Sequence, residues 1–286
     1  MEGSPRPDFR QSRVRLPPEA FAIASGPDLP PRDLIKKSVW ASIVSFPDDV
    51  SIRTSDDHGT DLEAMHELWG SWIESCGSDQ DPVSYFMLDS ADEFQASMFN
   101  SLCGFYRIAS DSLRAAIEKA TVGVYFQLCA LEQWKPEVSL EVKFGSACDG
   151  LSGHSSIRPL SEYLKSKIGS AIFEKKTLSD PGGWARRLYS RLSEFAHAKG
   201  GKTSAAMWEG SNGPIYVSKS FGETYALYLD TMALSFALVK LARPSFILPG
   251  AAKNLLANPP DVRPSKVSVY TFEFLYKLPR NSLLKS

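Results

Sequence analysis

The sequence predicts a mainly α protein, a helical bundle with a proline-rich N-terminal arm and a few short peripheral strands. Apolar residues recur at intervals of three and four over several long segments, which is the period of an amphipathic helix. The first 33 residues hold seven of the nineteen prolines, a density that disfavours long regular elements because proline fixes φ and lacks an N–H. With 286 residues, of which 43% are hydrophobic, the chain is long enough to bury a sizeable core.

The composition along the chain suggests four regions. Residues 1–46 are expected to form the proline-rich arm, 47–93 an acidic helical segment, 94–245 the helical bundle and 246–286 a C-terminal extension. Short runs of β-branched and aromatic residues predict the peripheral strands. These strands are expected at 38–44, 138–144, 215–217 and 266–278.

Two helices are predicted in the N-terminal half. Residues 61–75 place leucine, methionine and tryptophan at helical spacing behind an acidic first turn, which suits the helix dipole. The strongest helical signal runs from 91 to 131, with Ser110 or Asp111 as the cap if the helix breaks there. Within it, Arg114 and Glu118 stand four residues apart beside the apolar stripe, a spacing that predicts an ion pair on the helix surface.

Three more helices are predicted in the C-terminal half. The first is a basic amphipathic helix over 157–172. Asp180-Pro181 supplies an N-cap and a first helical position for the next one, and Gly200-Gly201 ends it. Ser220-Phe221-Gly222-Glu223 has the pattern of a capping box and opens the last helix, which Pro244 ends.

Charge is distributed unevenly along the chain. Residues 47–93 contain thirteen acids and one base, a net charge of 1 − 13 = −12, whereas residues 94–286 contain 24 bases and 15 acids, a net charge of +9. Residues 158–202 alone contain ten bases and four acids. Such a basic region favours a polyanion or an acidic protein surface as a partner. The alternative is that the acidic segment folds onto the basic one and neutralises it.

Cysteine usage and hydropathy indicate a cytoplasmic protein. The four cysteines have no paired CxxC spacing, and Cys103 and Cys129 lie in apolar, helix-like runs where a free thiol packs as a small hydrophobic group. The simpler interpretation is a reducing compartment. The N-terminal arm lacks the apolar core of a secretory signal, and no run of about 18 apolar residues is present, so no membrane span is expected.

The helix that precedes Gly200 is both basic and amphipathic. Its apolar stripe consists of Trp184, Leu188, Leu192 and Phe195. At about 100° per residue, Arg187 and Arg191 fall along one edge of this stripe, Glu194 just outside them and His197 nearly opposite it. A histidine near a helix C-terminus is also favoured by the dipole alone. Because Arg191 and His197 point in different directions, a second copy of the helix or a distorted last turn is needed to bring them together.

The chain resembles the HEPN superfamily, the helical domains of many bacterial toxins and antiphage defence proteins. The resemblance lies in Arg191, followed after five residues by His197 near the end of a helix, and in the long preceding helix that contains Ser112–Glu118. The string Leu188–His197 is also similar to Tyr-x-x-Leu-Ser-x-x-x-His segments in that group. The resemblance covers roughly residues 95–243.

The resemblance implies a bundle of four or five helices that dimerises, with the active site where two such helices face each other. The implied activity is metal-independent RNA cleavage without a cofactor, with His197 as general acid or base and Arg191 binding the phosphate. The implied setting is a toxin–antitoxin or antiviral defence system, with RNA or a protein of the same system as partner, in a homodimer or a larger complex. The supporting residues would be Arg114, Glu118, Glu194 and Arg187, and the RNA-binding residues Arg186, Lys199 and Lys202.

One position departs from this pattern. Active members often have a polar residue directly after the arginine, whereas here Leu192 belongs to the apolar stripe. This departure favours the alternative hypothesis, a non-catalytic interaction subunit of a defence complex that binds a protein partner. A weaker alternative is an unrelated small-molecule enzyme with its pocket between helices.

Other chemistry has little support in the sequence. His58 lies among Asp56, Asp57 and Asp61, which are metal-ligand residue types, but an acidic loop in solvent is the interpretation we favour. Cys148 and His154 are six residues apart, without a third group that would fix the histidine as a base. The sequence contains no Walker loop and no dinucleotide fingerprint, so neither a metal nor a cofactor is expected.

Overall fold

The computed structural model describes residues 43, 46–77, 81–130, 184–196 and 214–257. The chain divides into two units, Met1–Ser45 and Phe46–Ser286, and all the described helices belong to the second. The described residues form six helices and no strand, which confirms the mainly α prediction. These helices are α4 (Phe46–Cys76), α5 (Pro82–Leu102), α6 (Tyr106–Ala130), α10 (Trp184–Ala196), α12 (Ser218–Ala242) and α13 (Gly250–Ala257).

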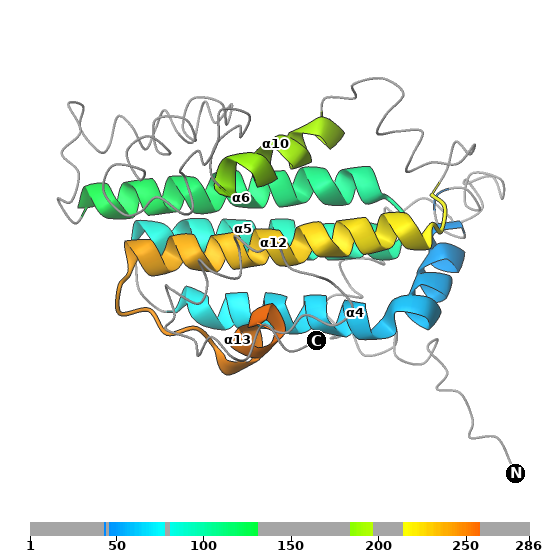
Figure 1. Ribbon diagram of the computed structural model, residues 1–286, viewed down its shortest axis with the longest axis horizontal. Helices are drawn as coiled ribbons and strands as arrows, with labels where there is room; N and C mark the ends of the chain where they lie inside the picture. The colour runs from blue at the N-terminus through cyan, green and yellow to red at the C-terminus, as the bar shows by residue number, and fades with distance from the viewer. Residues whose placement is uncertain (1–42, 44–45, 78–80, 131–183, 197–213, 258–286) are drawn as a thin grey trace, which may run out of the picture. The chain divides into compact units, whose positions relative to one another are not determined.

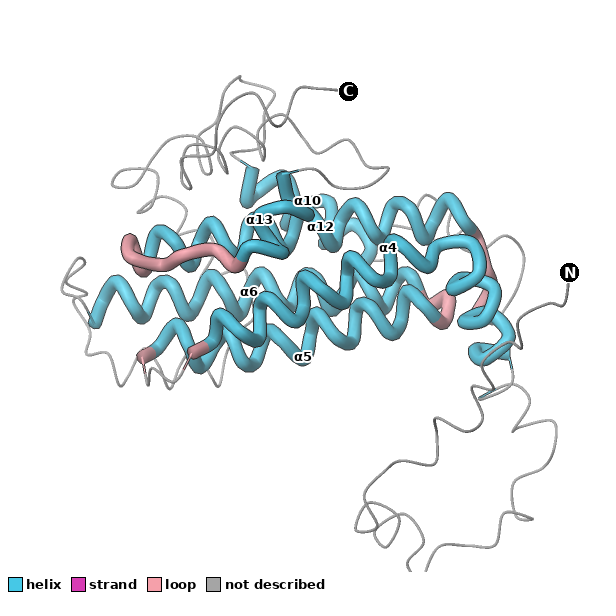
Figure 2. The backbone as a smooth tube through the Cα atoms, turned by 90° about the horizontal axis from the view of Figure 1, so that it is seen from below, coloured by secondary structure: helices cyan, strands magenta, loops and turns pink. Residues whose placement is uncertain are grey.

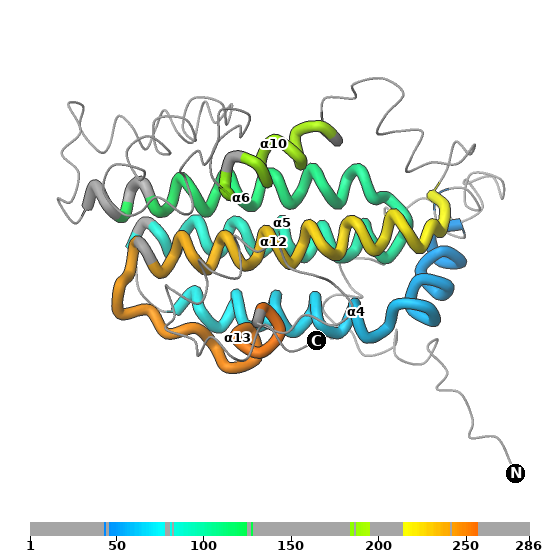
Figure 3. The backbone as a smooth tube through the Cα atoms, in the orientation of Figure 1, coloured from blue at the N-terminus to red at the C-terminus, as the bar shows by residue number. Residues whose placement is uncertain are grey.

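Four long helices, α4, α5, α6 and α12, run side by side (Figures 1 and 2). The colour gradient in Figure 3 shows that α4, α6 and α12 run in one direction and α5 in the other. The short α10 packs on the outside of α6, and the short α13 packs against α4. Burying one face of α10 on α6 leaves its other face available to solvent, where its side chains can meet a ligand.

The core between the long helices is rich in aromatic side chains. Trp72 of α4 meets Phe94 of α5 and Phe236 of α12 edge to face, with ring centroids 5.4 and 5.0 Å apart. Tyr228 of α12 packs on Phe94 at 5.8 Å and donates its hydroxyl to the carbonyl of Met65. Edge-to-face aromatic pairs add stability beyond the area that they bury. Helices from the acidic segment and from the rest of the chain therefore share one core.

The predicted helix over 61–75 is confirmed, but it forms only the second half of α4. The first half includes the residues around His58, which the sequence placed in an acidic loop, and that interpretation is wrong because Asp56 and Asp57 lie in a helix. The backbone leaves helical geometry at His58, where φ is −131° and ψ is 28°. The kink gives α4 two segments of different direction (Figure 1).

The predicted helix over 91–131 is split into α5 and α6, and the break is at Cys103–Phe105 rather than at Ser110. Gly104 lies between them with φ +79°, in the left-handed region that glycine adopts without strain. A Cβ at Gly104 would lie 2.6 Å from the carbonyl oxygen of Ile215. The break thus needs a glycine both for its backbone angle and for the close approach of the segment before α12.

Helix α12 begins at Ser218, two residues before the predicted capping box. Its N-cap is Val217, which has no side-chain cap and whose N–H donates to the hydroxyl of Tyr106 at 3.1 Å. Ser220 is buried inside the first turn, so the capping-box prediction is wrong. The end of the helix before Pro244 is confirmed. The strand predicted at 215–217 is also wrong, because these residues pair with no strand in the described part of the chain.

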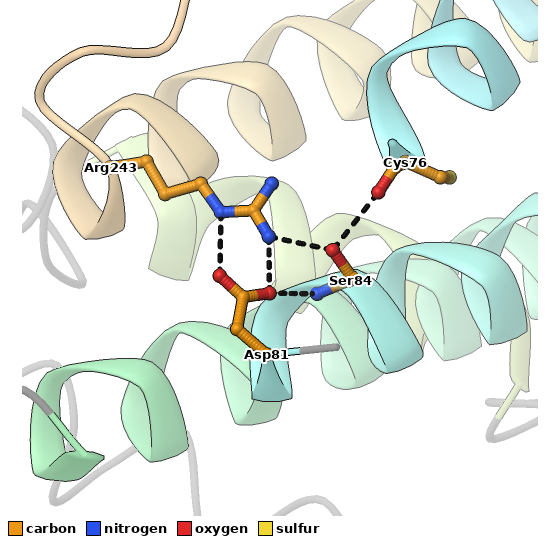
Figure 4. A network of polar contacts seen from close by, with 4 residues as sticks. All are labelled: Cys76, Asp81, Ser84 and Arg243. Carbon is orange, nitrogen blue, oxygen red and sulfur yellow. Dashed lines mark hydrogen bonds and ion pairs between the residues drawn. The ribbon is translucent and has the colours of Figure 1, made fainter. Parts of the chain in front are cut away.

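An arginine clamp joins three helix ends (Figure 4). Arg243, just after α12, donates from Nε to Asp81 Oδ2 at 2.9 Å and from Nη2 to Asp81 Oδ1 and Ser84 Oγ. Asp81 is at the same time the N-cap of α5, and Ser84 donates to the carbonyl of Cys76 at the end of α4. Burial raises the pKa of the Cys76 thiol to about 11 despite the nearby guanidinium, so Cys76 is a packed, unreactive thiol.

Several predicted features lie outside the described residues. They are the helix over 157–172, the Asp180-Pro181 and Gly200-Gly201 signals, the strands at 138–144 and 266–278, and all of 38–44 except Ile43. Helix α13, in contrast, was not predicted: its region, 246–286, was expected to contain a strand.

Candidate functional site

Helix α10 is fixed to α6 by its apolar stripe. Trp184, Leu188 and Leu192 are buried as the helical spacing predicts, and Leu192 is 0% exposed. The side chain of Phe195 lies outside the described residues. Burial of three large apolar side chains explains why so short a helix packs stably, since helices of this length are marginal alone in water. The stripe also determines which residues of α10 face outward.

Tyr189 joins α10 to α6 through polar contacts. Its hydroxyl donates to Glu118 Oε1 at 2.6 Å, and the Nε–H of Arg114 is shared between Glu118 Oε1 at 3.1 Å and the Tyr189 hydroxyl oxygen at 3.2 Å. The Arg114 guanidinium also lies over the Tyr189 ring, 5.3 Å from its centroid. We call Arg114, Glu118 and Tyr189 the Tyr189 network. The predicted ion pair between Arg114 and Glu118 is therefore confirmed, with the tyrosine as an additional partner.

Burial and neighbouring charges shift the pKa values of Tyr189 and Arg114. Burial raises the pKa of Tyr189, the hydrogen bond to Glu118 raises it further, and the contact with Arg114 opposes both. Burial works to lower the pKa of Arg114, but the bonds to Tyr189 and Glu118 outweigh it and the pKa is raised. The guanidinium therefore stays charged and paired within the network, and the phenol keeps its proton. Such a network suits holding two helices together.

The outward face of α10 holds the predicted functional residues that the structure describes. Arg191 and Glu194 are exposed, and Arg187, one turn before Arg191, is half-buried and has a further interaction partner. Arg186 belongs to α10 but its side chain lies outside the described residues, as do His197, Lys199 and Lys202. The structure therefore brings Arg114 and Glu118 together with α10 and places Arg191 in solvent.

A second polar cluster lies where the kink of α4 meets the start of α12. His58 Nδ1 is 3.1 Å from Asp61 Oδ2, and His58 Nε2 is 3.0 Å from Ser218 Oγ. The His58 ring stacks on Phe221, with centroids 4.4 Å apart. We call His58, Asp61 and Ser218 the Ser218 network. It links a histidine and a carboxylate of one helix to a hydroxyl 160 residues further along the chain.

Tyr216 borders the Ser218 network. It donates to Asp57 Oδ2 at 2.6 Å and lies under the guanidinium of Arg53, 4.7 Å from the ring centroid. Burial and the bond to Asp57 raise the pKa of Tyr216, while hydrogen bonding with Ser218 and the charge of Arg53 lower it, and the net shift is upward. The carboxylate of Asp57 is thus already hydrogen-bonded to Tyr216. Within the described residues no group of three histidine, cysteine or carboxylate side chains is placed to hold a metal.

Comparison with known proteins adds no relative: no family model, no curated protein and no solved structure matches the chain. Among the described helices, none combines the length and apolar character needed to cross a membrane. The features that bear on function are therefore the two networks and the outward face of α10.

The sequence predicted no role for two residues of these networks, Tyr189 and Ser218. Tyr189 had a usable signal, because it directly follows Leu188 of the apolar stripe, where a tyrosine can bury its ring while its hydroxyl hydrogen-bonds. Ser218 had none, because its contact with His58 depends on the kink of α4 and on the packing of α12.

Proposed function

We propose that this chain is a HEPN-like protein that acts on RNA through the outward face of α10. Arg191 binds a backbone phosphate, and His197, six residues further along, moves the protons of the cleavage reaction as general acid or base. The complete site forms where α10 of one copy faces α10 of a second copy. The setting that we propose is bacterial defence or toxin function.

The observation that supports this proposal is the exposure of Arg191 on a helix that is fixed by its neighbours. Leu188 and Leu192 bury one side of α10, and Tyr189 is bonded to Glu118, so α10 presents Arg191 to solvent in a defined direction. The described helix contains three arginines and one glutamate, a net charge of 3 − 1 = +2. A preorganised arginine on a basic helix is suited to a phosphate because its planar fork binds two oxygens.

Binding to a fluorescent single-stranded RNA at several salt concentrations tests the phosphate contact. We expect Arg191→Ala to weaken binding and to reduce the slope of log affinity against log salt by about 0.7, the change for one lost contact to a single strand. Arg107→Ala is the matched control, because Arg107 is exposed on α6 and lies outside α10. Equal slopes for wild type and Arg191→Ala would refute the proposed contact.

Incubation of RNA with wild type and with His197→Ala, in the presence of a chelator, tests cleavage. We expect wild type to cut and the variant to lose activity by about 100-fold or more, the typical contribution of a positioned acid or base. Cleavage by both proteins at the same rate, or by neither, removes the nuclease proposal. Sedimentation of the same samples reports the dimer that the proposed site requires.

A second candidate function is a non-catalytic subunit that binds a protein partner. The complete burial of Leu192 favours it, because the position after Arg191 cannot offer a polar side chain to a substrate. Exposed Glu63, Glu67 and Glu74 lie on α4, at spacings of four and seven that share one helix face. If that face binds a basic partner, changing all three to glutamine abolishes capture of the partner, whereas His197→Ala leaves capture intact.

A further inference from the structure

We propose that Ser218 is an activated nucleophile that is acylated by small carboxylic esters, with His58 as its general base and Asp61 as the group that orients His58. The site is separate from the RNA-binding face of α10, and it stands or falls independently of that function. The proposal is supported by the contacts of the Ser218 network, by the stacking of His58 on Phe221 and by the position of Ser218 at the start of α12.

The distances are those of a nucleophile and its base. Ser218 Oγ and His58 Nε2 are 3.0 Å apart, and His58 Nδ1 and Asp61 Oδ2 are 3.1 Å apart. Both lie within the range of about 2.6–3.2 Å expected for a nucleophile, a base and the group that orients the base. Ser218 is exposed and can be reached by a substrate, whereas the side chains of His58 and Asp61 are only 17% and 14% exposed.

Hydrogen-bond chemistry determines which ring nitrogen is the base. An ionised carboxylate can only accept, so the contact with Asp61 places the proton of the neutral ring on Nδ1. Nε2 then has a free lone pair directed at the Ser218 hydroxyl. This is the tautomer that a general base needs, and the carboxylate also stabilises the imidazolium that forms when the base accepts a proton.

The His58 ring is held in place by its surroundings. The backbone is non-helical at His58 itself, so this residue does not follow the regular course of α4. One face of the ring stacks on Phe221, 4.4 Å away at an interplanar angle of 27°. Both ring nitrogens are engaged and one ring face is covered, so the imidazole is positioned before a substrate arrives.

The start of α12 provides stabilisation for a developing negative charge. Ser218 is the first residue of a 25-residue helix, and the first-turn N–H groups of a helix have no carbonyl acceptor within it. These N–H groups and the positive end of the helix dipole lie beside the Ser218 side chain. A carbonyl oxygen of a substrate bound at Ser218 would face this end as it becomes an oxyanion.

The reaction balances without any additional reagent except water. Ser218 Oγ bonds to the ester carbonyl carbon while its proton moves to His58 Nε2. The C–O bond to the leaving group then breaks, and His58 returns the proton to the departing oxygen, which leaves as an alcohol. Water, losing a proton to His58, attacks the acyl carbon; the bond to Oγ breaks, Ser218 regains the proton, and a carboxylic acid leaves.

Reaction with a fluorophosphonate probe tests nucleophilicity directly. Its fluoride is displaced by an activated serine, so we expect intact mass to show one adduct and peptide mapping to place it on Ser218. Hydrolysis of p-nitrophenyl acetate should fall by about 100-fold or more in Ser218→Ala and His58→Asn.

The controls are the same residue types exposed on α4, changed in Ser55→Ala, His66→Asn and Asp56→Asn. These variants should react like wild type. The proposal is overturned if excess probe leaves wild type unmodified, if the adduct maps to another residue, or if His58→Asn reacts as fast as wild type. Because mapping uses the unaltered protein, a variant that fails to fold does not prevent a decision.

Discussion

The Tyr189 network and the Ser218 network each join two helices with a charged residue and a hydroxyl, but they leave that hydroxyl in opposite states. In the Tyr189 network the phenol donates to Glu118 at 2.6 Å and accepts from Arg114, so its donor and acceptor capacity is used within the protein. In the Ser218 network the hydroxyl is exposed at a helix start and faces a histidine nitrogen. Similar residue types thus stabilise the fold in one place and offer reactivity in the other.

The environment of each hydroxyl explains the difference. Burial and Glu118 raise the pKa of Tyr189, so its proton is retained and the oxygen is a poor nucleophile. Ser218 is exposed and lies 3.0 Å from His58 Nε2, a ring nitrogen that can take its proton when a bond forms to carbon. A closed polar network therefore indicates a structural role, and an open one a chemical role.

The largest effect that we expect concerns the apolar attachment of α10, which positions the Tyr189 network. Leu192→Ala should lower the free energy of unfolding by about 2–5 kcal/mol, because it removes a fully buried side chain and leaves a cavity. Its neighbour on the chain provides the control: Arg191→Ala should change stability by less than about 0.5 kcal/mol, since Arg191 is exposed. Urea unfolding of both variants measures the difference, and equal stabilities would show that Leu192 does not contribute to the attachment of α10.

A smaller effect is expected when the phenol of the Tyr189 network is removed. Tyr189→Phe should lower the free energy of unfolding by about 0.5–1.5 kcal/mol at neutral pH, the usual net worth of a hydrogen bond. Because the folded protein raises the pKa of Tyr189, this stabilisation is complete below about pH 10 and is lost as the pH rises above it towards the folded pKa.

Urea unfolding between pH 7 and 11 checks this dependence. The gap between wild type and Tyr189→Phe should narrow above pH 10. Tyr106, Tyr216 and Tyr228 also have raised pKa values, but they are present in both proteins and cancel in the comparison. A gap that stays constant to pH 11 would show that the Tyr189 hydroxyl does not titrate differently in the folded and unfolded states.

Sequence patterns could predict the Tyr189 network in part because its contacts follow helix periodicity. Arg114 and Glu118 are one turn apart, and the stripe through Leu188 and Leu192 correctly identified the buried side of α10. The start of α5 was missed although the signal was present: Asp81-Pro82 is the same cap pattern that we read at 180–181. The break at Gly104 was hidden because apolar spacing continues through it and the close approach of Ile215 is a tertiary contact.

The Ser218 network could not be predicted from the sequence, for physical reasons that apply widely. Its histidine and its serine are 160 residues apart, and no local pattern records a contact over such a separation. The kink at His58 is not produced by a proline, and the glycine that follows it, Gly59, weakens a helix without by itself fixing a break there. The acidic residues around His58 suggested a metal or a solvated loop, whereas of the three neighbouring aspartates, all of which the structure describes, Asp61 is the one that bonds the imidazole.

Removing the Ser218 hydroxyl should affect stability less than removing the Tyr189 hydroxyl. Ser218→Ala should change the free energy of unfolding by less than about 0.5 kcal/mol, because its exposed hydroxyl exchanges a protein hydrogen bond for one to water. Urea unfolding measures it beside Tyr189→Phe. A loss as large as that of Tyr189→Phe would mean that Ser218 serves to hold α12 against α4. If Ser218→Ala loses probe labelling but almost no free energy of unfolding, the Ser218 oxygen serves reactivity and not stability.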